Sequence, residues 1–286
     1  MAILLNGKML AQAVRCEVKD QVAHFRMQYG HAPGLATVLV GDDSVSRVYV
    51  GTKEKACREV GIASFGYRLP ATVSATEVFQ LIGELNERPE VHGILIQLPL
   101  PHHLEKGKII DALAPHKDVD ALHPLNQGRL LLGQKGLRPC TPLGVMRLLE
   151  ESHISLTGKK AVIVGRSLLV GKPVALMLLE KNATVTCCHS QTTDLAAEVR
   201  VADVVVAAIG QPEIIKGQWI KEGAVVIDVG ISRLADGTLK GDVEFAVAQE
   251  RAAFITPVPG GVGPMTVAML LVNTLKAAET QKQSGQ

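Results

Sequence analysis

A lysine and a tyrosine one helical turn apart are the first candidates for chemistry in this sequence. Tyr49 and Lys53 are spaced i, i+4, so on a helix they share one face, and Ser46 lies one turn earlier on nearly the same stripe. A lysine in a cleft can donate or accept a proton if desolvation lowers its pKa. The alternative, which the spacing alone favours, is an exposed lysine beside a half-buried tyrosine.

Polar residues that follow apolar runs give further candidates. Gln97 stands at the end of such a run, where open α/β sheets bind ligands, or it ties down its own loop. Asp118 and Asp120 open an irregular stretch, in which an aspartate could hold an amidine-like ring edge or cap a turn. Pro259 and Gly260 begin a rigid loop, poor in side chains, that lets a flat ligand lie on the backbone or simply connects two domains. Both interpretations remain open for each.

The second half of the chain carries a strand–glycine–helix junction of the kind that binds phosphates. A strand ends at Gly165-Arg166-Ser167 and a helix begins near Gly171. Such a junction presents unpaired backbone amides and the positive end of a helix dipole to an anion. The G-x5-G spacing differs from the G-x-G-x-x-G fingerprint, so an ordinary tight turn is the alternative.

The next strand end favours NADP over NAD. The strand that follows the junction ends just before Ser190, with no acid to bind a ribose 2′-hydroxyl. Arg166 could pair with an additional 2′-phosphate, which a carboxylate would repel. The alternatives are a solvated surface arginine and a Ser190 that caps a helix over residues 192–199. Two later strand ends, residues 208–210 and 228–231, place small residues where a cofactor would approach closely.

Short β-branched runs alternate with helix-like stretches along most of the chain. Continuous apolar strands separated by helices indicate parallel sheets covered on both faces, and the length indicates two domains. We therefore expect an α/β fold with two domains, each a mainly parallel sheet flanked by helices. Residues 117–141 are rich in turn formers and are expected to pass between the domains, and the last helix, residues 264–278, to return to the first. The expected strands are residues 34–41, 62–69, 93–98, 160–165, 184–188, 203–209, 224–230 and 253–256, and the expected earlier helices are residues 9–29, 43–60 and 74–87.

Composition excludes several classes of protein. The chain has 286 residues, of which 47% are hydrophobic and 3% aromatic, with 30 basic and 28 acidic side chains. The apolar content excludes a disordered chain, and the balanced charge with few aromatics argues against a nucleic-acid partner. Five sparse cysteines without CxxC spacing argue against a disulfide framework or structural zinc and favour a reducing, cytoplasmic compartment.

The sequence predicts neither a membrane anchor nor a metal site. The N-terminus lacks a basic region before its short apolar run, unlike a secretory signal. The uncharged stretch 252–275 is long enough to span a bilayer, but its prolines and glycines break it into a strand, a loop and a helix start. Four histidines between positions 102 and 123 match no established ligand spacing, so we expect no metal dependence.

Six motifs carry a resemblance to a known enzyme family. They are YVGTK at 49–53, QLPLP at 97–101, KDVD at 117–120, PCTP at 139–142, GRSLLVGKP at 165–173 and PGGVGPMT at 259–266. With them the chain closely resembles the bifunctional methylenetetrahydrofolate dehydrogenase/methenyltetrahydrofolate cyclohydrolase family, nearly end to end. The resemblance implies NADP-dependent oxidation of 5,10-methylenetetrahydrofolate to the methenyl cation, followed by hydrolysis to 10-formyltetrahydrofolate.

The resemblance also implies roles for individual residues. Lys53 would be the central catalytic residue of the hydrolytic step, and Gln97 would hydrogen-bond to it and tune it. Tyr49 would stack on the folate, and Asp120 would grip the pterin ring. The remaining implied contacts are Ser46, Pro259 and Gly260 for the substrate, and Gly165, Arg166, Ser167, Ser190 and Ile231 for the cofactor.

The family's organisation assigns a function to each domain. By resemblance, residues 1–140 and the C-terminal helix 264–286 form the folate-binding catalytic domain, and residues 141–263 form a Rossmann-like NADP-binding domain. Members usually form homodimers, so we expect one here. Ala121 departs from the pattern, because the family usually has glycine after KDVD and the loop must accommodate a Cβ.

Two other functions compete with the folate enzyme. One is another two-domain NADP-dependent dehydrogenase, shikimate-dehydrogenase-like, with Lys53 as its acid or base. The other is a dinucleotide-sensing regulatory or scaffold protein without catalysis. The YVGTK, QLPLP and PGGVGPMT motifs argue against the first, and the presence of both Lys53 and Gln97 argues against the second.

Overall fold

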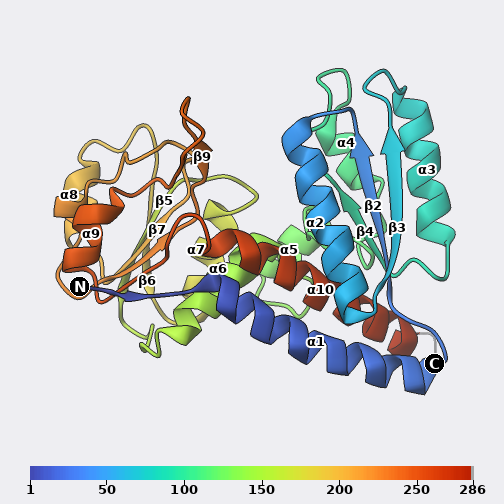
Figure 1. Cartoon of the computed structure of the whole chain (residues 1–286), viewed down its shortest axis with the longest axis horizontal. Coiled ribbons are helices and arrows are strands. Elements are labelled where there is room, and N and C mark those ends of the chain that lie inside the picture. Colours follow the sequence, from blue (N-terminus) through green and yellow to red (C-terminus); the bar gives the residue numbers. More distant parts are fainter. Residues whose placement is uncertain (285–286) are drawn as a thin grey trace. The chain divides into compact units, whose positions relative to one another are not determined.

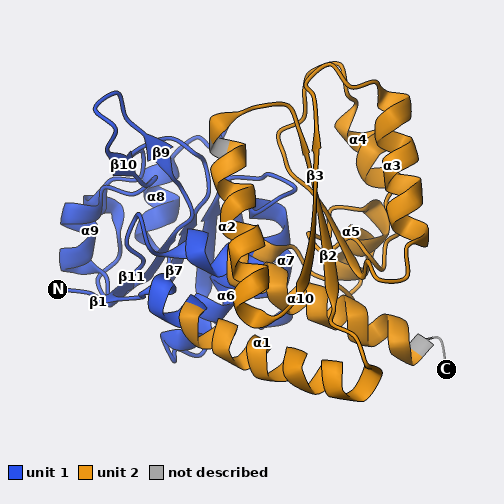
Figure 2. Cartoon of the chain, turned by 45° about the vertical axis from the view of Figure 1, so that its right-hand side comes forward, with its two compact units in different colours: residues 1–11, 141–266 blue, residues 12–140, 267–286 orange. Residues whose placement is uncertain are grey.

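The computed structural model describes residues 1–284 and divides into two compact units (Figure 2). Unit 1 comprises Met1–Ala11 and Thr141–Thr266, and unit 2 comprises Gln12–Cys140 and the described part of Val267–Gln286. Two long helices, α1 (Gly7–Tyr29) and α10 (Val262–Ser284), continue from one unit into the other.

Unit 2 contains a three-stranded parallel sheet in the order β3-β2-β4 (Figure 1). Its strands are β2 (Gly34–Val40), β3 (Ala63–Leu69) and β4 (Gly93–Ile96). Every residue of β2 is buried, as a central strand covered on both faces requires. The three strands predicted for this region are confirmed, with ends shifted by one or two residues.

Two capped helices follow these strands and cover the sheet. Helix α2 (Ser44–Val60) begins after Asp43, whose carboxylate accepts a hydrogen bond from the backbone of Ser46 at 2.7 Å. Helix α3 (Ala75–Glu87) begins at a capping box. The apolar face of α3 packs, together with α4 (Lys106–Asp111), in one buried cluster with β2 and β4. Both predicted helices, residues 43–60 and 74–87, are confirmed.

The stretch expected to pass between the domains is part of unit 2 as far as Cys140. It contains a helix, α5 (Pro124–Leu131), which the sequence did not predict. This helix has proline in its first turn, and His123 Nδ1 accepts a hydrogen bond from the backbone of Leu125 at 3.1 Å. Eight residues are too few to show a helical period clearly. The many turn-forming residues around them therefore led to the prediction of an irregular segment.

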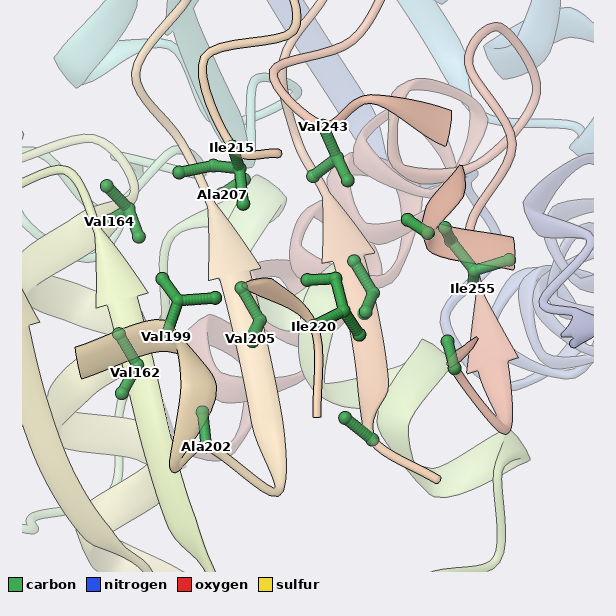
Figure 3. Close-up of a cluster of buried hydrophobic side chains, with 14 of the residues drawn as sticks. Val162, Val164, Val199, Ala202, Val205, Ala207, Ile215, Ile220, Val243 and Ile255 are labelled. Atoms are coloured by element: carbon green, nitrogen blue, oxygen red, sulfur yellow. The ribbon is translucent and has the colours of Figure 1, made fainter. Parts of the chain in front are cut away.

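Unit 1 contains a six-stranded sheet, all parallel, in the order β1-β11-β8-β7-β5-β6. Its strands are β1 (Ile3–Leu4), β5 (Lys160–Val164), β6 (Thr184–Cys188), β7 (Val204–Ala207), β8 (Val225–Asp228) and β11 (Phe254–Ile255). Its other elements are α6 (Cys140–Glu151), α7 (Gly171–Glu180), α8 (Leu195–Arg200), the 3-10 helix η1 (Gly217–Trp219), the hairpin β9 (Ser232–Arg233) and β10 (Leu239–Lys240), and α9 (Phe245–Arg251). Aliphatic side chains of β5, β7 and β8 form the buried cluster of Figure 3. The predicted α/β class with mainly parallel sheets is confirmed.

The structure corrects one expectation and excludes one alternative in unit 1. The sequence predicts residues 1–11 in the first domain, whereas β1 pairs with β11, Ile3 opposite Phe254, and so belongs to the second sheet. A two-residue strand carries no periodic signal, so its partner could not be predicted locally. Ser190 does not cap a helix, because α8 starts only at Leu195 and is capped by Asp194.

Each sheet reverses its strand order at one place. In unit 2 the chain goes from β2 to β3 on one side and then to β4 on the other, and in unit 1 it goes likewise from β5 to β6 and then to β7. Ligands of open α/β sheets bind outside the carboxyl ends of the strands at such a switch point. Both units therefore offer one place for a site. Within residues 1–284, no helix is long and apolar enough to cross a membrane.

Candidate active site

A lysine and a glutamine meet beside the switch point of unit 2. Lys53 lies on α2, which follows β2, and its Nζ donates a hydrogen bond to Gln97 Oε1 at 2.9 Å. Gln97 directly follows β4, and its backbone N–H donates to the carbonyl of Val38 on β2 at 2.9 Å. Its Nε2 donates to the carbonyl of Leu98 at 2.7 Å, which orients the side-chain oxygen toward the lysine. The interpretation of Gln97 as tying down its own loop is correct for this amide nitrogen, while the oxygen binds Lys53.

Burial determines the ionisation of Lys53. Desolvation lowers the pKa of its amine below the usual range, and the negative charge of nearby Asp120 partly offsets this effect. Two cysteines close to the lysine do not ionise, because burial raises the pKa of Cys57 to about 12 and that of Cys140 well above its ordinary value. The amine can therefore lose its proton more readily than a surface lysine, which is what an acid–base group requires.

The other two predicted residues of α2 lie on the turns before Lys53. Ser46 is buried near the start of the helix, and Tyr49 is 37% exposed one turn before the lysine. Tyr49 thus presents an aromatic surface that the chain itself leaves uncovered. The structure brings Lys53 and Gln97 into contact and places Ser46 and Tyr49 on the same helix as the lysine.

The two aspartates of the KDVD segment have different surroundings. Asp118 is buried, and its Oδ2 accepts hydrogen bonds from the backbone of His123 at 2.8 Å and from Asn126 Nδ2 at 2.9 Å. Asp118 therefore holds the loop before α5. Asp120 is partly exposed and acts electrostatically on Lys53, so it is the aspartate of this pair that is available to a ligand.

Two side chains that the sequence did not single out hold the segment bearing Asp120. Asn273 Nδ2 on α10 donates to the carbonyls of Val119 and Arg138, both at 2.7 Å. Cys140 Sγ donates to the carbonyl of Val119 at 3.3 Å. The PCTP motif was a signal for Cys140, whereas nothing near Asn273 in the sequence indicates a contact with residues more than a hundred positions earlier.

The phosphate-type turn of unit 1 is built from glycines in close approach. A Cβ on Gly165, whose φ is +124°, would lie 2.2 Å from the carbonyl oxygen of Ala208 after β7. A Cβ on Gly171 would lie 2.1 Å from the carbonyl oxygen of Gly165. No side chain caps α7 at Val170, although Ser167 Oγ accepts a hydrogen bond from the Val170 backbone at 3.1 Å. In the first turn of α7, the N–H groups of Gly171 and Lys172 are bound by Ser167, at 3.5 Å to its Oγ and 3.0 Å to its carbonyl, and Pro173 has none. What this helix start offers an anion is therefore the positive end of its dipole.

The side chains around this turn fit a dinucleotide that carries a 2′-phosphate. Three exposed side chains lie here: Arg166 and Ser167 follow β5, and Ser190 follows β6. These two strands pair with each other, with Val164 opposite Cys188. No carboxylate lies among residues 189–191, so nothing there would repel an additional phosphate. Ile231, which follows β8, is 48% exposed.

The last two predicted residues, Pro259 and Gly260, belong to unit 1 rather than to the unit of Lys53. Gly260 has a φ of +107°, which favours glycine, and its carbonyl accepts a hydrogen bond from the backbone of Lys8 at 2.9 Å. Among residues 1–284, no group of three or more His, Cys, Asp or Glu residues is arranged to hold a metal ion.

These features define a two-unit α/β protein with a lysine-centred site in one unit and a dinucleotide-type phosphate turn in the other. Residues 5–120 match the tetrahydrofolate dehydrogenase/cyclohydrolase catalytic domain, and residues 139–282 match the NAD(P)-binding domain of the same family. The chain therefore belongs to the tetrahydrofolate dehydrogenase/cyclohydrolase family, and the shikimate-dehydrogenase-like alternative is not supported.

Curated relatives and solved structures agree with this family. The bifunctional protein FolD of Geotalea uraniireducens is 57% identical over 98% of this chain and 99% of its own. The bifunctional FolD enzyme of Campylobacter jejuni has a similar structure, with a TM-score of 0.96 and 47% identity over 98% of this chain and 100% of that one. The FolD of Trypanosoma brucei, solved with NADP cofactor and inhibitor, has a TM-score of 0.96 and 42% identity over 99% of both chains.

Proposed function

We propose that this protein oxidises 5,10-methylenetetrahydrofolate to 5,10-methenyltetrahydrofolate with NADP+ and then hydrolyses the product to 10-formyltetrahydrofolate. The observation that carries the proposal is the part-buried Lys53–Gln97 pair in a chain whose two halves match the two domains of one folate-enzyme family. Both activities appear in the names of its solved relatives.

In the hydrolytic step, Lys53 would transfer the protons. Its pKa is already lowered by burial, and a cationic methenyl substrate beside it would lower the pKa further. A neutral amine can take a proton from the water that attacks the cationic carbon and can return it as the ring opens. Gln97 Oε1 would hold Nζ in position, since its own amide is oriented by the Leu98 carbonyl.

The remaining residues of unit 2 would orient the folate. Tyr49 has the exposed ring needed to stack on a flat pterin, and Asp120 has a carboxylate that can accept two hydrogen bonds from an amidine-like ring edge. Ser46 completes this set on α2. Together these assignments make residues 12–140 with the C-terminal helix the folate-binding part of the chain.

Unit 1 would bind the dinucleotide. NADP+, when bound, supplies the hydride acceptor of the oxidation. The turn that follows Gly165 would receive phosphate, assisted by the positive end of the α7 dipole and with Ser167 beside it. Arg166 and Ser190 would contact the 2′-phosphate, and Ile231 would pack against the cofactor. These assignments favour NADP+ over NAD+ because the usual acid after β6 is absent and Arg166 follows the neighbouring strand β5.

We also propose that the protein acts in the cytoplasm as a homodimer, without a membrane or nucleic-acid partner. All five cysteines are free thiols, which suits a reducing compartment. The balance of 30 basic and 28 acidic side chains provides no basic stripe for nucleic acid. Sedimentation at micromolar concentration tests the dimer, and a mass of one chain would contradict it.

The first experiment is a spectrophotometric assay with methylenetetrahydrofolate and NADP+, repeated with NAD+. Methenyl product that forms and then decays faster than the uncatalysed rate establishes both activities. Methenyl product that forms without accelerated decay would show a dehydrogenase without cyclohydrolase activity, and would contradict the role of Lys53 in hydrolysis. Absence of turnover with either nucleotide would contradict the proposal.

A further inference from the structure

A buried carboxylate fills the loop that follows β7. Asp242 is fully buried, and its Oδ2 accepts hydrogen bonds from the backbone N–H groups of Ile209 at 2.6 Å and Gly210 at 3.0 Å. Its Oδ1 accepts a third, from the backbone of Gln211 at 2.9 Å. Three consecutive amides of one loop therefore converge on a single side chain.

A second buried carboxylate holds the first. Asp228, the last residue of β8, is 4% exposed, and its Oδ1 accepts hydrogen bonds from the backbone of Gly230 and of Asp242, both at 2.9 Å. Its Oδ2 accepts from the backbone of Val243, also at 2.9 Å. Burial raises the pKa of Asp228 to about 7, so its charged form depends on these three donors. We call the two aspartates the aspartate clamp. Asp242 binds the loop after β7, and Asp228, at the end of β8, binds the backbone of Asp242 and of Gly230 in the loop after β8.

Two glycines show that these loops are built around the carboxylates. A Cβ on Gly230 would lie 2.1 Å from Asp242 Oδ1, and a Cβ on Gly241 would lie 2.0 Å from Asp228 Oδ2. Apolar residues close the space beneath, where Ala207, Ile215 and Val243 lie at the carboxyl ends of β7 and β8 (Figure 3). Burying two acids in this way is costly, so the arrangement calls for a reason beyond packing.

The clamped loops lie at the switch point of unit 1. The loop after β7 starts at Ala208, whose backbone donates to the Val164 carbonyl at 2.8 Å, directly beside the turn at Gly165. The loop after β8 continues from Gly230 into the exposed Ile231. The clamp thus joins the loop that borders the phosphate turn to the loop after the next strand, β8. The hydrogen bonds that its two carboxylates accept come from backbone N–H groups.

We propose that Asp228 and Asp242 are positioning residues that hold the loops after β7 and β8 in the shape that receives the dinucleotide. This inference rests on the proposed function, since it takes unit 1 to be the NADP+ site. Six N–H groups are directed inward by the two carboxylates, so the outer edges of both loops keep one conformation before the nucleotide arrives. Such preorganisation increases affinity without a direct contact.

The decisive variant is Asp242→Asn, which keeps the size of the side chain but places an amide donor against backbone donors. Calorimetric titration of the purified protein with NADP+ should show Kd raised tenfold or more. The KM for NADP+ in the dehydrogenase assay should rise by the same factor, with kcat at saturating NADP+ within threefold of wild type. Hydrolysis of methenyltetrahydrofolate, assigned to Lys53 in unit 2, should stay within twofold.

Asp203→Asn is the matched control. Asp203 precedes β7 at the amino end of the same sheet, and it also holds backbone, accepting from Lys160 N at 2.9 Å and pairing with Lys221 Nζ at 2.6 Å. A purely structural effect of losing a carboxylate would weaken NADP+ binding in both variants. The proposal requires that Asp203→Asn leave Kd within twofold.

Three results separate the possible failures. If Asp242→Asn does not fold, Asp228→Asn serves in its place. Its amide oxygen can still accept a hydrogen bond, but its amide nitrogen faces backbone donors, so the support of Asp242 weakens and the Kd for NADP+ should rise at least threefold. An unchanged Kd in a folded clamp variant, or an equal rise in Asp203→Asn, overturns the clamp. Wild-type protein that binds NADP+ but turns over no folate contradicts the proposed function and leaves the clamp standing.

Discussion

The two units place their sites at the same topological position but build them differently. In unit 2, the site at the switch point consists of side chains, with Lys53 held by Gln97 at 2.9 Å and its pKa lowered by burial. In unit 1, the site consists of a backbone turn, with close-packed glycines at 165 and 171 before the start of α7. The difference suits proton transfer in one unit and phosphate recognition in the other.

This contrast predicts how each site responds to substitution. A site made of one ionisable side chain loses its chemistry when that side chain is removed, although the fold remains. A site made of backbone amides keeps phosphate binding when one surface side chain is lost, and changes mainly in selectivity. The following changes test this contrast, beginning with the largest expected effect.

Lys53→Met should reduce hydrolysis of methenyltetrahydrofolate by about 10²- to 10⁴-fold, the range typical of a lost acid–base group. Methionine keeps the apolar stem, so the protein should fold and its Kd for NADP+ should stay within twofold. The measurement is the decay rate of the methenyl absorbance. Lys55→Met, which removes an exposed lysine of the same helix, is the control. Retained hydrolysis in a folded Lys53→Met protein would show that the unit 2 site does not depend on this side chain.

Arg166→Ala should weaken NADP+ binding about 10- to 100-fold, the value of one or two charge-assisted hydrogen bonds. NAD+ binding should change less than threefold, because the backbone amides of the turn remain. Calorimetric titration with both nucleotides measures the two constants, and Arg200→Ala, an exposed arginine at the end of α8, is the control. Equal weakening for both nucleotides would mean that Arg166 does not contact the 2′-phosphate.

Burial also lowers the pKa of His92, so this residue gives a second test that burial sets the ionisation of side chains in unit 2. His92 is buried, its Nδ1 accepts a hydrogen bond from Gly34 N at 3.0 Å, and burial lowers its pKa to about 4. Because the unfolded imidazole binds a proton near pH 6.5 and the folded one does not, the stability contributed by His92 is complete above pH 6.5. It is lost as the pH falls toward 4, by about 2 kcal/mol at pH 5.

The His92→Asn variant isolates this contribution. Asparagine can still accept the Gly34 hydrogen bond but does not titrate, so the variant should lose about 2 kcal/mol less than wild type between pH 7.5 and pH 5. Urea unfolding at the two pH values measures the difference. Asp228, whose raised pKa acts in the opposite direction, is present in both proteins and cancels.

Backbone conformation also matters beside the side-chain site, where the smallest effect is expected. Ala121, next to Asp120, has a φ of +52° that favours glycine. Ala121→Gly should raise the free energy of unfolding by less than about 1 kcal/mol, because relief of the left-handed conformation slightly exceeds the loss of a buried methyl group. Ala175→Gly in helix α7 should lower it by about 1 kcal/mol in the same urea experiment. A fall in the free energy of unfolding in both variants would show that the backbone at Ala121 is not strained.

Much of the site could be predicted because its signals are local. The i, i+4 spacing of Tyr49 and Lys53 and the buried run before Gln97 placed these residues on a helix and at a strand end, and the structure confirms both placements. Residue types after β5 and β6 likewise predicted a phosphate turn without an acid. The departure at Ala121 was also visible, and it coincides with a positive φ.

The rest depended on contacts between distant segments. Asp242 looks like an ordinary turn residue in Gly241-Asp242-Val243, and only the fold brings it to the amides of residues 209–211. Asn273 and the pairing of β1 with β11 were hidden for the same reason.

The sequence by itself determined the α/β class, most of the strands and longer helices and the residue types available at each strand end, because apolar periodicity and capping act within a few positions. Only the tertiary structure decided which strand ends adjoin, that Lys53 meets Gln97, and that two buried aspartates hold the loops of unit 1. The physical reason is that desolvation and convergent hydrogen bonds arise when segments far apart in the chain exclude water together.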